Sequence, residues 1–421
     1  MLAKVGVMLV KSIVTTFALS NYLNSGQFGI LNYPMTIVTF STAIAALGLD
    51  GFITRELLSS PQKSNTYLGT AFIMRVMAGL VTLPLVYLAY HVIDANSVKP
   101  LQTPFRYVFI VAFVAIVQSV NIIDSFFQSK IQGKYIMYVQ LTGNILSTLT
   151  KLIFILLKLP LVWFVYSLLL DAVFVAVSYI FIYQSKGNNI FQWRFDKGVA
   201  IHLLKHSWPL AFSAVLGTIY MKIDQGMIGS YLNIDQLGIY SNVANLSESY
   251  YFIPVTVVTS VFPAIMHARN TDKDRYYKRL QNLYDLMVVL SLGAAIILSF
   301  GSTFIFHSFL KKEYWPGAPV LSVYVWAGVF SFLGTASGQY LIAEGYTRLA
   351  MVRTGAGAIV NIVLNIFWIP KYGIIGAAYA TLIAYAVAAF FILFIPKTRG
   401  QGVQMLKSLF LFSLFQKAFN R

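Results

Sequence analysis

Long apolar runs separated by short polar stretches make up most of this chain. A helix needs about 20 mostly apolar residues to cross the hydrocarbon core of a bilayer. Twelve runs approach or exceed that length: 3–20, 28–48, 67–92, 105–128, 137–157, 161–183, 208–228, 237–262, 283–308, 318–342, 348–369 and 373–395. The pattern therefore predicts an all-α integral membrane protein with about 12 transmembrane helices.

The composition agrees with this prediction and excludes several kinds of chemistry. Hydrophobic residues make up 58% of the chain and charged residues 11%, with a mean hydropathy of +0.71. A soluble domain has roughly a quarter of its residues charged, so the bilayer is the expected solvent. The chain has no cysteine, which excludes disulfides and thiolate sites. The first run lacks a small-residue cleavage site, so we expect it to be a retained span.

The basic residues predict the topology. Lys and Arg together number 31, against 14 Asp and Glu. With both termini cytoplasmic, and with basic residues at the first two positions of a run counted with the adjoining loop, twenty of the basic residues fall in inside segments, six in outside segments and five within spans. This bias is typical of cytoplasmic loops, so it explains the positive charge without nucleic acid. We expect a multi-pass membrane protein with both ends on the cytoplasmic side.

An internal repeat divides the chain into two halves. "YLNSGQFGILNY" (22–33) returns as "YLNIDQLGIYSN" (231–242), and "GKYIMYVQLTG" (133–143) is similar to "GYTRLAMVRTG" (345–355). Each offset spans an even number of helices, so the copies point the same way through the membrane, as in transporters with parallel repeats. We predict an N-lobe of six spans (1–184), a cytoplasmic linker (185–206), a C-lobe of six spans (207–396) and a basic interfacial tail (397–421).

Ionisable residues within the spans are the candidate functional groups, because a charge at mid-bilayer costs roughly 2.5–3.5 kcal/mol on insertion scales. Two interpretations are open: the charges pair as structural bridges or snorkel, or they line a wet cavity. We expect the first for Lys11 and Asp285, and leave both open for Asp171. The basic set is Lys11, Arg75, Lys151, Lys222 and Arg353, and the acidic set is Asp124, Asp171, Asp224, Glu248 and Asp285.

Three of the cations indicate a cavity for an anionic solute. Arg75, Lys222 and Arg353 are spread over the third, seventh and eleventh predicted spans. Lys222 and Asp224 are two residues apart and so face different sides of a helix. The planar guanidinium of arginine suits phosphate particularly well.

No enzyme signature or metal site is recognisable in the sequence. The chain has no GxxxxGK[ST] loop for ATP, no GxSxG and no HExxH. His202 and His206 are spaced i, i+4 but have no neighbouring carboxylate in the sequence, so we assign them to an interfacial amphipathic helix. We predict a protein that is not an enzyme and needs no cofactor.

Several stretches in a fixed order resemble bacterial O-antigen repeat-unit flippases. They are "LGLDGFITREL" (47–57), "YLGTAFIMR" (67–75), "SWPLAFSAVLGTIYMKIDQGMIGSYLNIDQLGIYSNVANLSESYYFIP" (207–254), "VFPAI" (261–265), "APVLSVYVWAGVFSFLGTASGQYLIAEG" (318–345) and "PKYGIIGAAYATLIAYAVAAF" (370–390). This family is the polysaccharide transporter branch of the multidrug/oligosaccharidyl-lipid/polysaccharide (MOP) superfamily. Nearly the whole chain is covered. The first helix is short by comparison.

The resemblance implies a V-shaped pair of six-helix lobes related by a pseudo-twofold axis, as in the MATE transporters. The implied cargo is an oligosaccharide on undecaprenyl pyrophosphate, moved from the cytoplasmic to the periplasmic leaflet by alternating access, with membrane lipids and polysaccharide assembly proteins as partners. Its pyrophosphate or sugar would contact the cavity cations, and a coupling proton or sodium ion would bind at the acids. The implied contacts are Arg75, Lys222, Arg353 and, as a lesser candidate, Lys151; the acids are Asp224, Glu248 and Asp124.

Three other functions compete with this interpretation. A cation-coupled drug or metabolite exporter of the same superfamily shares the plan, but cationic drugs call for an acidic or aromatic cavity. A flippase for the peptidoglycan precursor usually has fourteen spans. A non-transporting scaffold for polysaccharide assembly would have no use for buried cations.

Overall fold

The computed structural model describes residues 16–97 and 100–413, and its regular structure within these ranges is entirely helical. Nine helical stretches in this part of the chain are long and apolar enough to cross a membrane. The all-α prediction is therefore confirmed. The predicted first span (3–20), including Lys11, lies largely outside the described residues, although residues 16–22 are helical. Residues 414–421 of the predicted tail lie outside them as well.

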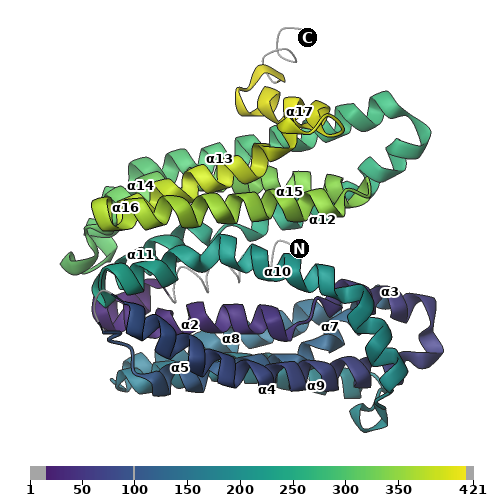
Figure 1. The fold of residues 1–421 in the computed structure, drawn as a ribbon, viewed down its shortest axis with the longest axis horizontal. Helices are drawn as coiled ribbons and strands as arrows, with labels where there is room; N and C mark the ends of the chain where they lie inside the picture. Colours follow the sequence, from purple (N-terminus) through teal and green to yellow (C-terminus); the bar gives the residue numbers. More distant parts are fainter. Residues whose placement is uncertain (1–15, 98–99, 414–421) are drawn as a thin grey trace. The chain divides into compact units, whose positions relative to one another are not determined.

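The chain divides into two compact units, Met1–Gly238 and Ile239–Arg421. Figure 1 shows their helices coloured along the sequence. Unit 1 contains α2 (Ser25–Ala45), α3 (Leu49–Ser59), α4 (Ser64–Asn96), α5 (Phe105–Ala112), α6 (Val114–Val117), α7 (Ile122–Ser129), α8 (Gly133–Leu156), α9 (Leu161–Ser185) and α10 (Lys197–Tyr231). Unit 2 contains most of α11 (Ile234–Glu248), then α12 (Phe252–Thr271), α13 (Lys273–Phe309), α14 (Gly317–Tyr324), α15 (Ala327–Ala343), α16 (Thr347–Phe390) and α17 (Arg399–Leu409).

The packing units differ from the predicted lobes by one helix. The boundary falls in α11, so α10, which contains the seventh predicted span, packs in unit 1 against α2, α3 and α4. This helix also begins before the predicted span, because the side chain of Asp196 accepts a hydrogen bond from the N–H of Val199 and caps it. Residues 197–206, which we expected in the linker, are therefore helical.

Two predicted spans join without a loop in α16. Gly373, at φ +64°, interrupts the helical backbone, a conformation that glycine adopts without steric cost. The amide of Asn361, 12 residues before Gly373, lies 3.4 Å from Thr381 Oγ1, 8 residues after it, so the two arms meet side by side. The two arms of α16 therefore form an antiparallel hairpin, which accounts for the eleventh and twelfth predicted spans.

The two copies of the repeated motif pack against each other within unit 1. A methyl group on Gly29 would overlap the carbonyl oxygen of Ile234, and one on Gly238 would overlap the carbonyl oxygen of Ser25. Because the motif repeats at an offset of 209, Gly238 is the counterpart of Gly29, and Ile234 that of Ser25. The two contacts therefore exchange when the copies exchange, as at a twofold interface. Ser25 Oγ also donates to Asp235 Oδ1 at 3.0 Å.

An ion pair joins α8 to α9. Lys151 Nζ lies 2.5 Å from Asp171 Oδ2 and 2.8 Å from Ser147 Oγ, and Lys151 is only 6% exposed. Nearer the start of α8, Gly143 lets Val175 of α9 approach closely. Of the interpretations left open for Asp171, the structure shows a half-buried partner of Lys151.

The C-terminal helix packs onto unit 2. Gln401, Met405 and Ser408 of α17 are buried against α13. Asp285 of α13 is 3% exposed and accepts hydrogen bonds from Ser408 Oγ at 2.6 Å and from Ser413 Oγ. We expected Asp285 to pair with another charge or to snorkel; the structure instead shows a buried carboxylate held by hydrogen bonds from neutral side chains. The tail, which we expected along the membrane interface, makes its described contacts with protein.

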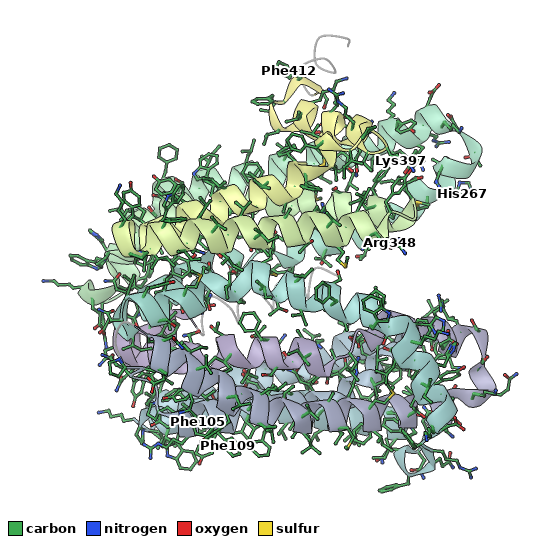
Figure 2. All side chains as sticks on the ribbon, in the orientation of Figure 1. Phe105, Phe109, His267, Arg348, Lys397 and Phe412 are labelled. Carbon is green, nitrogen blue, oxygen red and sulfur yellow. The ribbon has the colours of Figure 1, made fainter. Side chains whose placement is uncertain are left out.

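Large apolar side chains remain exposed on both units, as a lipid solvent allows. Phe109 of unit 1 is 40% exposed and Phe412 of unit 2 is 62% exposed (Figure 2). In unit 2, Arg348, Lys397 and His267 lie at one end of the helices (Figure 2). These three basic side chains thus lie at an end of unit 2, whereas large apolar side chains are exposed on the surface, as expected of a membrane-spanning bundle.

Replacing either motif glycine with alanine should destabilise the protein. In Gly29→Ala and in Gly238→Ala the added methyl group must push apart two backbones already in contact, and overpacking of this kind costs about 1–3 kcal/mol. We expect both variants to unfold at a lower temperature than wild type in mild detergent. Gly51→Ala is the matched control, since a methyl group there meets nothing within 4 Å. If Gly238→Ala unfolds at the same temperature as wild type, the close backbone contact at Gly238 is wrong.

Removing only the lysine of the α8–α9 ion pair should destabilise the protein more than removing both members of the pair. Lys151→Met leaves the Asp171 carboxylate half-buried without its cation, a cost on the order of 3 kcal/mol. The double variant Lys151→Met/Asp171→Leu should recover most of the melting temperature. The measurement is the melting temperature, obtained by heating the protein and monitoring the folded fraction by size-exclusion chromatography. If the double variant is the less stable of the two, the ion pair is not what holds these helices together.

Candidate functional site

A polar cavity of about 240 Å³ lies within unit 1, where α2, α3, α4 and the broken helix α5–α7 meet. The local structure of each helix places particular side chains at this cavity. Gly48, in the left-handed region at φ +62°, joins α2 to α3 and directly precedes α3, so Asp50 lies in the first turn of α3; Arg75 of α4 lines the same cavity. Between α6 and α7 the helix tightens into a 3₁₀ turn, Gln118–Asn121, and such interruptions often mark functional positions.

Arg75 and Asp50 form an ion pair at this cavity. Arg75 Nη2 lies 2.6 Å from Asp50 Oδ1, with Arg75 only 3% exposed and the Asp50 side chain 62% exposed. Ser125 of α7 donates to the backbone carbonyl of Asp50, which ties α3 to α7. The charge of Arg75 is thus balanced inside unit 1, and an anion that approached it would compete with Asp50.

A second carboxylate and two buried acceptors line the same cavity. Asp124 Oδ1 accepts a hydrogen bond from the amide of Gln128 at 3.0 Å. Ser119 is 1% exposed, and neither its Oγ nor the Oδ1 of Asn121 has a hydrogen-bond partner among the described protein groups. The charged side chains that line this cavity, within the part of the chain that the structure describes, are therefore Arg75, Asp50 and Asp124.

The other predicted groups of unit 1 lie away from this cavity. Lys222 is half-buried on α10, whereas Asp224 is 2% exposed and accepts the N–H of Gln225 at 2.7 Å. Lys151 is held by Asp171 between α8 and α9. Of the predicted site residues, the cavity brings together Arg75 and Asp124.

In unit 2, Arg353 is embedded between the first arm of α16 and α15. It is 9% exposed, with Nη1 donating to Ser337 Oγ at 3.1 Å and Nη2 to the carbonyl of Gly334 at 2.8 Å. Glu248 is half-buried and accepts a hydrogen bond from the hydroxyl of Tyr324 at 2.9 Å. The Arg353 guanidinium is thus oriented by neutral groups at the small-residue face of α15.

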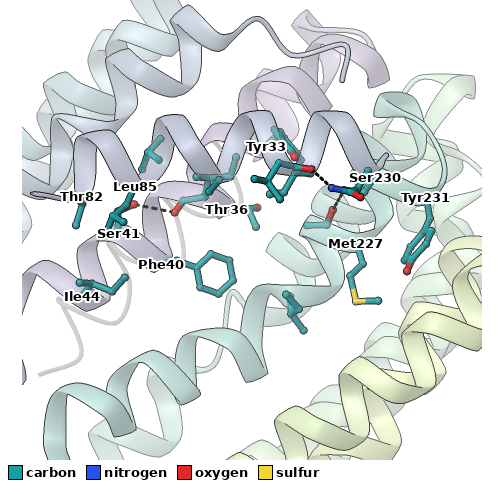
Figure 3. Close-up of a pocket in the computed structure, with 18 residues that line it drawn as sticks. Tyr33, Thr36, Phe40, Ser41, Ile44, Thr82, Leu85, Met227, Ser230 and Tyr231 are labelled. Atoms are coloured by element: carbon teal, nitrogen blue, oxygen red, sulfur yellow. Dashed lines mark hydrogen bonds between the residues drawn. The ribbon is translucent and has the colours of Figure 1, made fainter. Parts of the chain in front are cut away.

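A larger and mostly apolar cavity of about 630 Å³ lies between α2, α4 and α10 (Figure 3). Its lining includes Phe40 and Ile44 of α2, Leu85 of α4 and Met227 of α10. The polar groups of the lining include the hydroxyl groups of Thr36 and Ser230. None of the described lining residues carries a charge. A cavity of this size and character fits an apolar chain or a drug-sized molecule.

The histidine pair has a neighbour that the sequence did not indicate. His202 and His206 lie on α10, as expected of a helix, but His202 Nε2 is 3.9 Å from Glu56 Oε2 of α3. The ring of His206 stacks on Phe52. Among residues 16–97 and 100–413 no three His, Cys, Asp or Glu side chains form a metal-binding group.

Sequence reasoning missed Asp50, Ser119 and Asn121. Asp50 directly follows an apolar run in "LGLDG", and "QSVN" (118–121) interrupts another. Polar residues at the break of an apolar run were thus the available signal. Which of them share a cavity depends on the packing of helices far apart in the chain, which the pattern does not contain.

Comparison with known proteins places the chain in a family. A family model described as polysaccharide biosynthesis protein matches residues 1–269, and one described as MatE matches residues 209–367. The uncharacterized membrane protein YabM of Bacillus subtilis is 28% identical over 196 residues, 44% of this chain and 36% of YabM. The probable flippase AglR of Haloferax volcanii is 28% identical over 184 residues, 40% of this chain and 36% of AglR. The matches thus span just over a third of these relatives' lengths.

The fold has solved counterparts. The lipid II flippase MurJ, in an inward closed conformation, superposes with a TM-score of 0.72 at 17% identity, over 97% of this chain and 91% of MurJ. An inward-facing multidrug resistance MATE transporter, described as a member of the MOP superfamily, superposes with a TM-score of 0.69 at 13% identity, over 97% of this chain and 96% of the transporter. At these identities the likeness shows the fold alone. Because the family model covers well over half of its length, the chain belongs to the polysaccharide biosynthesis protein family, as a multi-pass membrane protein with the MOP transporter fold.

Proposed function

We propose that the protein is a flippase that moves undecaprenyl-pyrophosphate-linked oligosaccharide repeat units from the cytoplasmic to the periplasmic leaflet of a bacterial inner membrane. The family match and the relative named a probable flippase support transport of a lipid-linked saccharide. On this proposal both termini are cytoplasmic, transport proceeds by alternating access between two lobes, and the protein catalyses no covalent step.

The observation that carries the proposal is Arg353. A guanidinium nine-tenths buried between two membrane helices costs insertion energy, and buried charges of this kind commonly mark substrate or ion pathways in membrane proteins. Ser337 and Gly334 hold the group in place through neutral acceptors. Arginine binds phosphate through paired N–H donors, so we assign Arg353 to the pyrophosphate. Lys222 of α10 is a second candidate contact, for the phosphate or the sugar at another stage of transport.

The apolar cavity between α2, α4 and α10 supplies the complementary part. A lipid-linked saccharide has an anionic head and an isoprenoid tail, and we assign the first isoprene units to this cavity (Figure 3). Its uncharged lining does not favour a cationic drug. A drug or metabolite exporter of the same superfamily, to which the MatE match points, is the second candidate.

Neutralising the two candidate cations should stop flipping while the protein stays folded. Lys222→Gln/Arg353→Gln removes charge-assisted contacts to phosphate worth about 1.5–3 kcal/mol each, so we expect at least a tenfold slower transfer. The measurement is the sidedness of the undecaprenyl-linked oligosaccharide in cells depleted of the wild-type protein. Lys205→Gln/Arg348→Gln is the matched control, because it neutralises exposed cations on the same two helices.

Two results would contradict this assignment. If depletion leaves the lipid-linked intermediate reaching the periplasmic face at its normal rate, the cargo is wrong and small-molecule export takes its place. If the cargo depends on the protein but the Lys222/Arg353 variant transports like the control, the cargo stands and the two contacts are wrong.

A further inference from the structure

The turn between α7 and α8 presents an exposed isoleucine in a strained backbone conformation. Ile131 has φ +56°, in the left-handed region, and is 91% exposed. Its N–H donates to the carbonyl of Gln128, and the next N–H donates to that of Phe127, so α7 ends in a Schellman motif. Glycine is the usual residue at this position, and a β-branched residue is poorly suited to it. The turn therefore gives no reason for an isoleucine, and the side chain is available for a contact outside the chain.

Three exposed lysines surround this turn. Lys134 Nζ lies 5.1 Å from the centre of the Tyr135 ring, and Lys186 Nζ lies 4.8 Å from the same centre. Lys130 Nζ lies 5.9 Å from the centre of the Phe126 ring. In the part of the chain that the structure describes, none of the three lysines is ion-paired with an acid. Tyr135 thus brings together two positive charges from separate helices, and an anion bound by both would relieve their repulsion.

The lysines lie where two membrane helices begin and end. α8 is a candidate span that starts at Gly133, and α9 is one that ends at Ser185. Lys134 is the second residue of α8 and Lys186 directly follows α9, so both lie at the depth of lipid headgroups. Phe191, on the loop after α9, is 86% exposed. Exposed apolar side chains together with lysines are typical of segments that insert at the boundary between headgroups and acyl chains.

We propose that this end of unit 1 binds an anionic phospholipid of the surrounding bilayer. Lys134 and Lys186 contact the phosphate, and the Tyr135 ring holds their ammonium groups together. Lys130 adds a further positive charge, and Ile131 lies among the first carbons of the acyl chains. A soluble phosphate would gain nothing from the isoleucine, and a zwitterionic lipid carries a cation that the lysines repel. The site is independent of the cargo that the protein transports.

Phosphatidylglycerol is the probe, and native mass spectrometry of the full-length protein in detergent is the measurement. Wild type should bind it saturably and in preference to phosphatidylcholine. Lys134→Gln/Lys186→Gln should weaken binding roughly tenfold or more, because each lysine near an anionic lipid contributes to attraction. Tyr135→Leu should weaken it several-fold at unchanged net charge, because the two lysines are no longer held on one ring.

Matched controls separate this site from general attraction between opposite charges. Lys273→Gln/Lys278→Gln removes the same charge from two exposed lysines of α13 in unit 2. Tyr138→Leu removes a half-exposed ring one turn further along α8. Both should bind phosphatidylglycerol like wild type. Excess inorganic phosphate should not displace the lipid; displacement would make soluble phosphate the ligand and reject the proposal.

The absence of cysteine from the chain permits a second test, of where residue 131 lies. A nitroxide attached to Ile131→Cys, in nanodiscs that contain phosphatidylglycerol, should be reached more readily by oxygen than by a water-soluble nickel complex. Replacing phosphatidylglycerol with phosphatidylcholine should shift the label toward the nickel complex. Lys158→Cys is the matched control, because Lys158 is exposed at φ +51° in the equivalent position of the turn after α8. Its label should not respond to the change of lipid.

The proposal is overturned if the lysine variant or Tyr135→Leu binds phosphatidylglycerol like wild type. It is also overturned if the nickel complex reaches the label at residue 131 equally well in both lipids. The label leaves Lys130, Lys134 and Lys186 in place, so it decides the result if a lysine variant fails to fold.

Discussion

The close approach of two backbones at Gly29 and Gly238 is the constraint on which the rest of unit 1 depends. Each glycine faces a carbonyl oxygen of the other copy of the motif, so neither position accommodates a side chain. The contact fixes the start of α2 against the start of α11 and aligns α10 beside α2, where Thr36 donates to Gln225. Both cavities of unit 1 use α2 as a wall. The two copies of the motif thus contact each other, and because they do so through equivalent positions, glycine is required at the same position of both copies.

The charged side chains within the apolar helices differ in their partners, and this difference distinguishes structural charges from candidates for a functional role. Lys151 and Asp171 bring opposite charges together between two helices and form no part of either cavity. Arg75 and Asp50 also pair, but at the wall of a polar cavity, with the carboxylate largely exposed. Arg353 is oriented by a hydroxyl and a carbonyl group. A buried ion pair stabilises little beyond an apolar equivalent, so a pair at the wall of a cavity is a better functional candidate than one packed between two helices.

Much of the fold could be predicted because an apolar run of about 20 residues has one stable form in lipid, a helix. The bounds of the helices were harder to predict from the apolar pattern. Asp196 caps α10 and so starts this helix well before its apolar part. Gly373 joins the two arms of α16 without a separate loop. For the site, the sequence identified Arg75 and Asp124 one by one, because a charge in an apolar run is conspicuous. It did not indicate Asp50, which follows its run and acquires meaning only as the partner of a residue on another helix.

The docking of α17 has a consequence for how the protein is made. Tyr284 and Asp285 of α13 find hydrogen-bond partners in Gln401, Ser408 and residue 413 of the segment that follows α16. These contacts join residues separated by more than a hundred positions in the chain. During synthesis α13 is inserted long before that segment leaves the ribosome. The core of unit 2 is therefore completed only after the chain beyond α16 has been made, and a chain that ends before residue 401 lacks these partners of Tyr284 and Asp285.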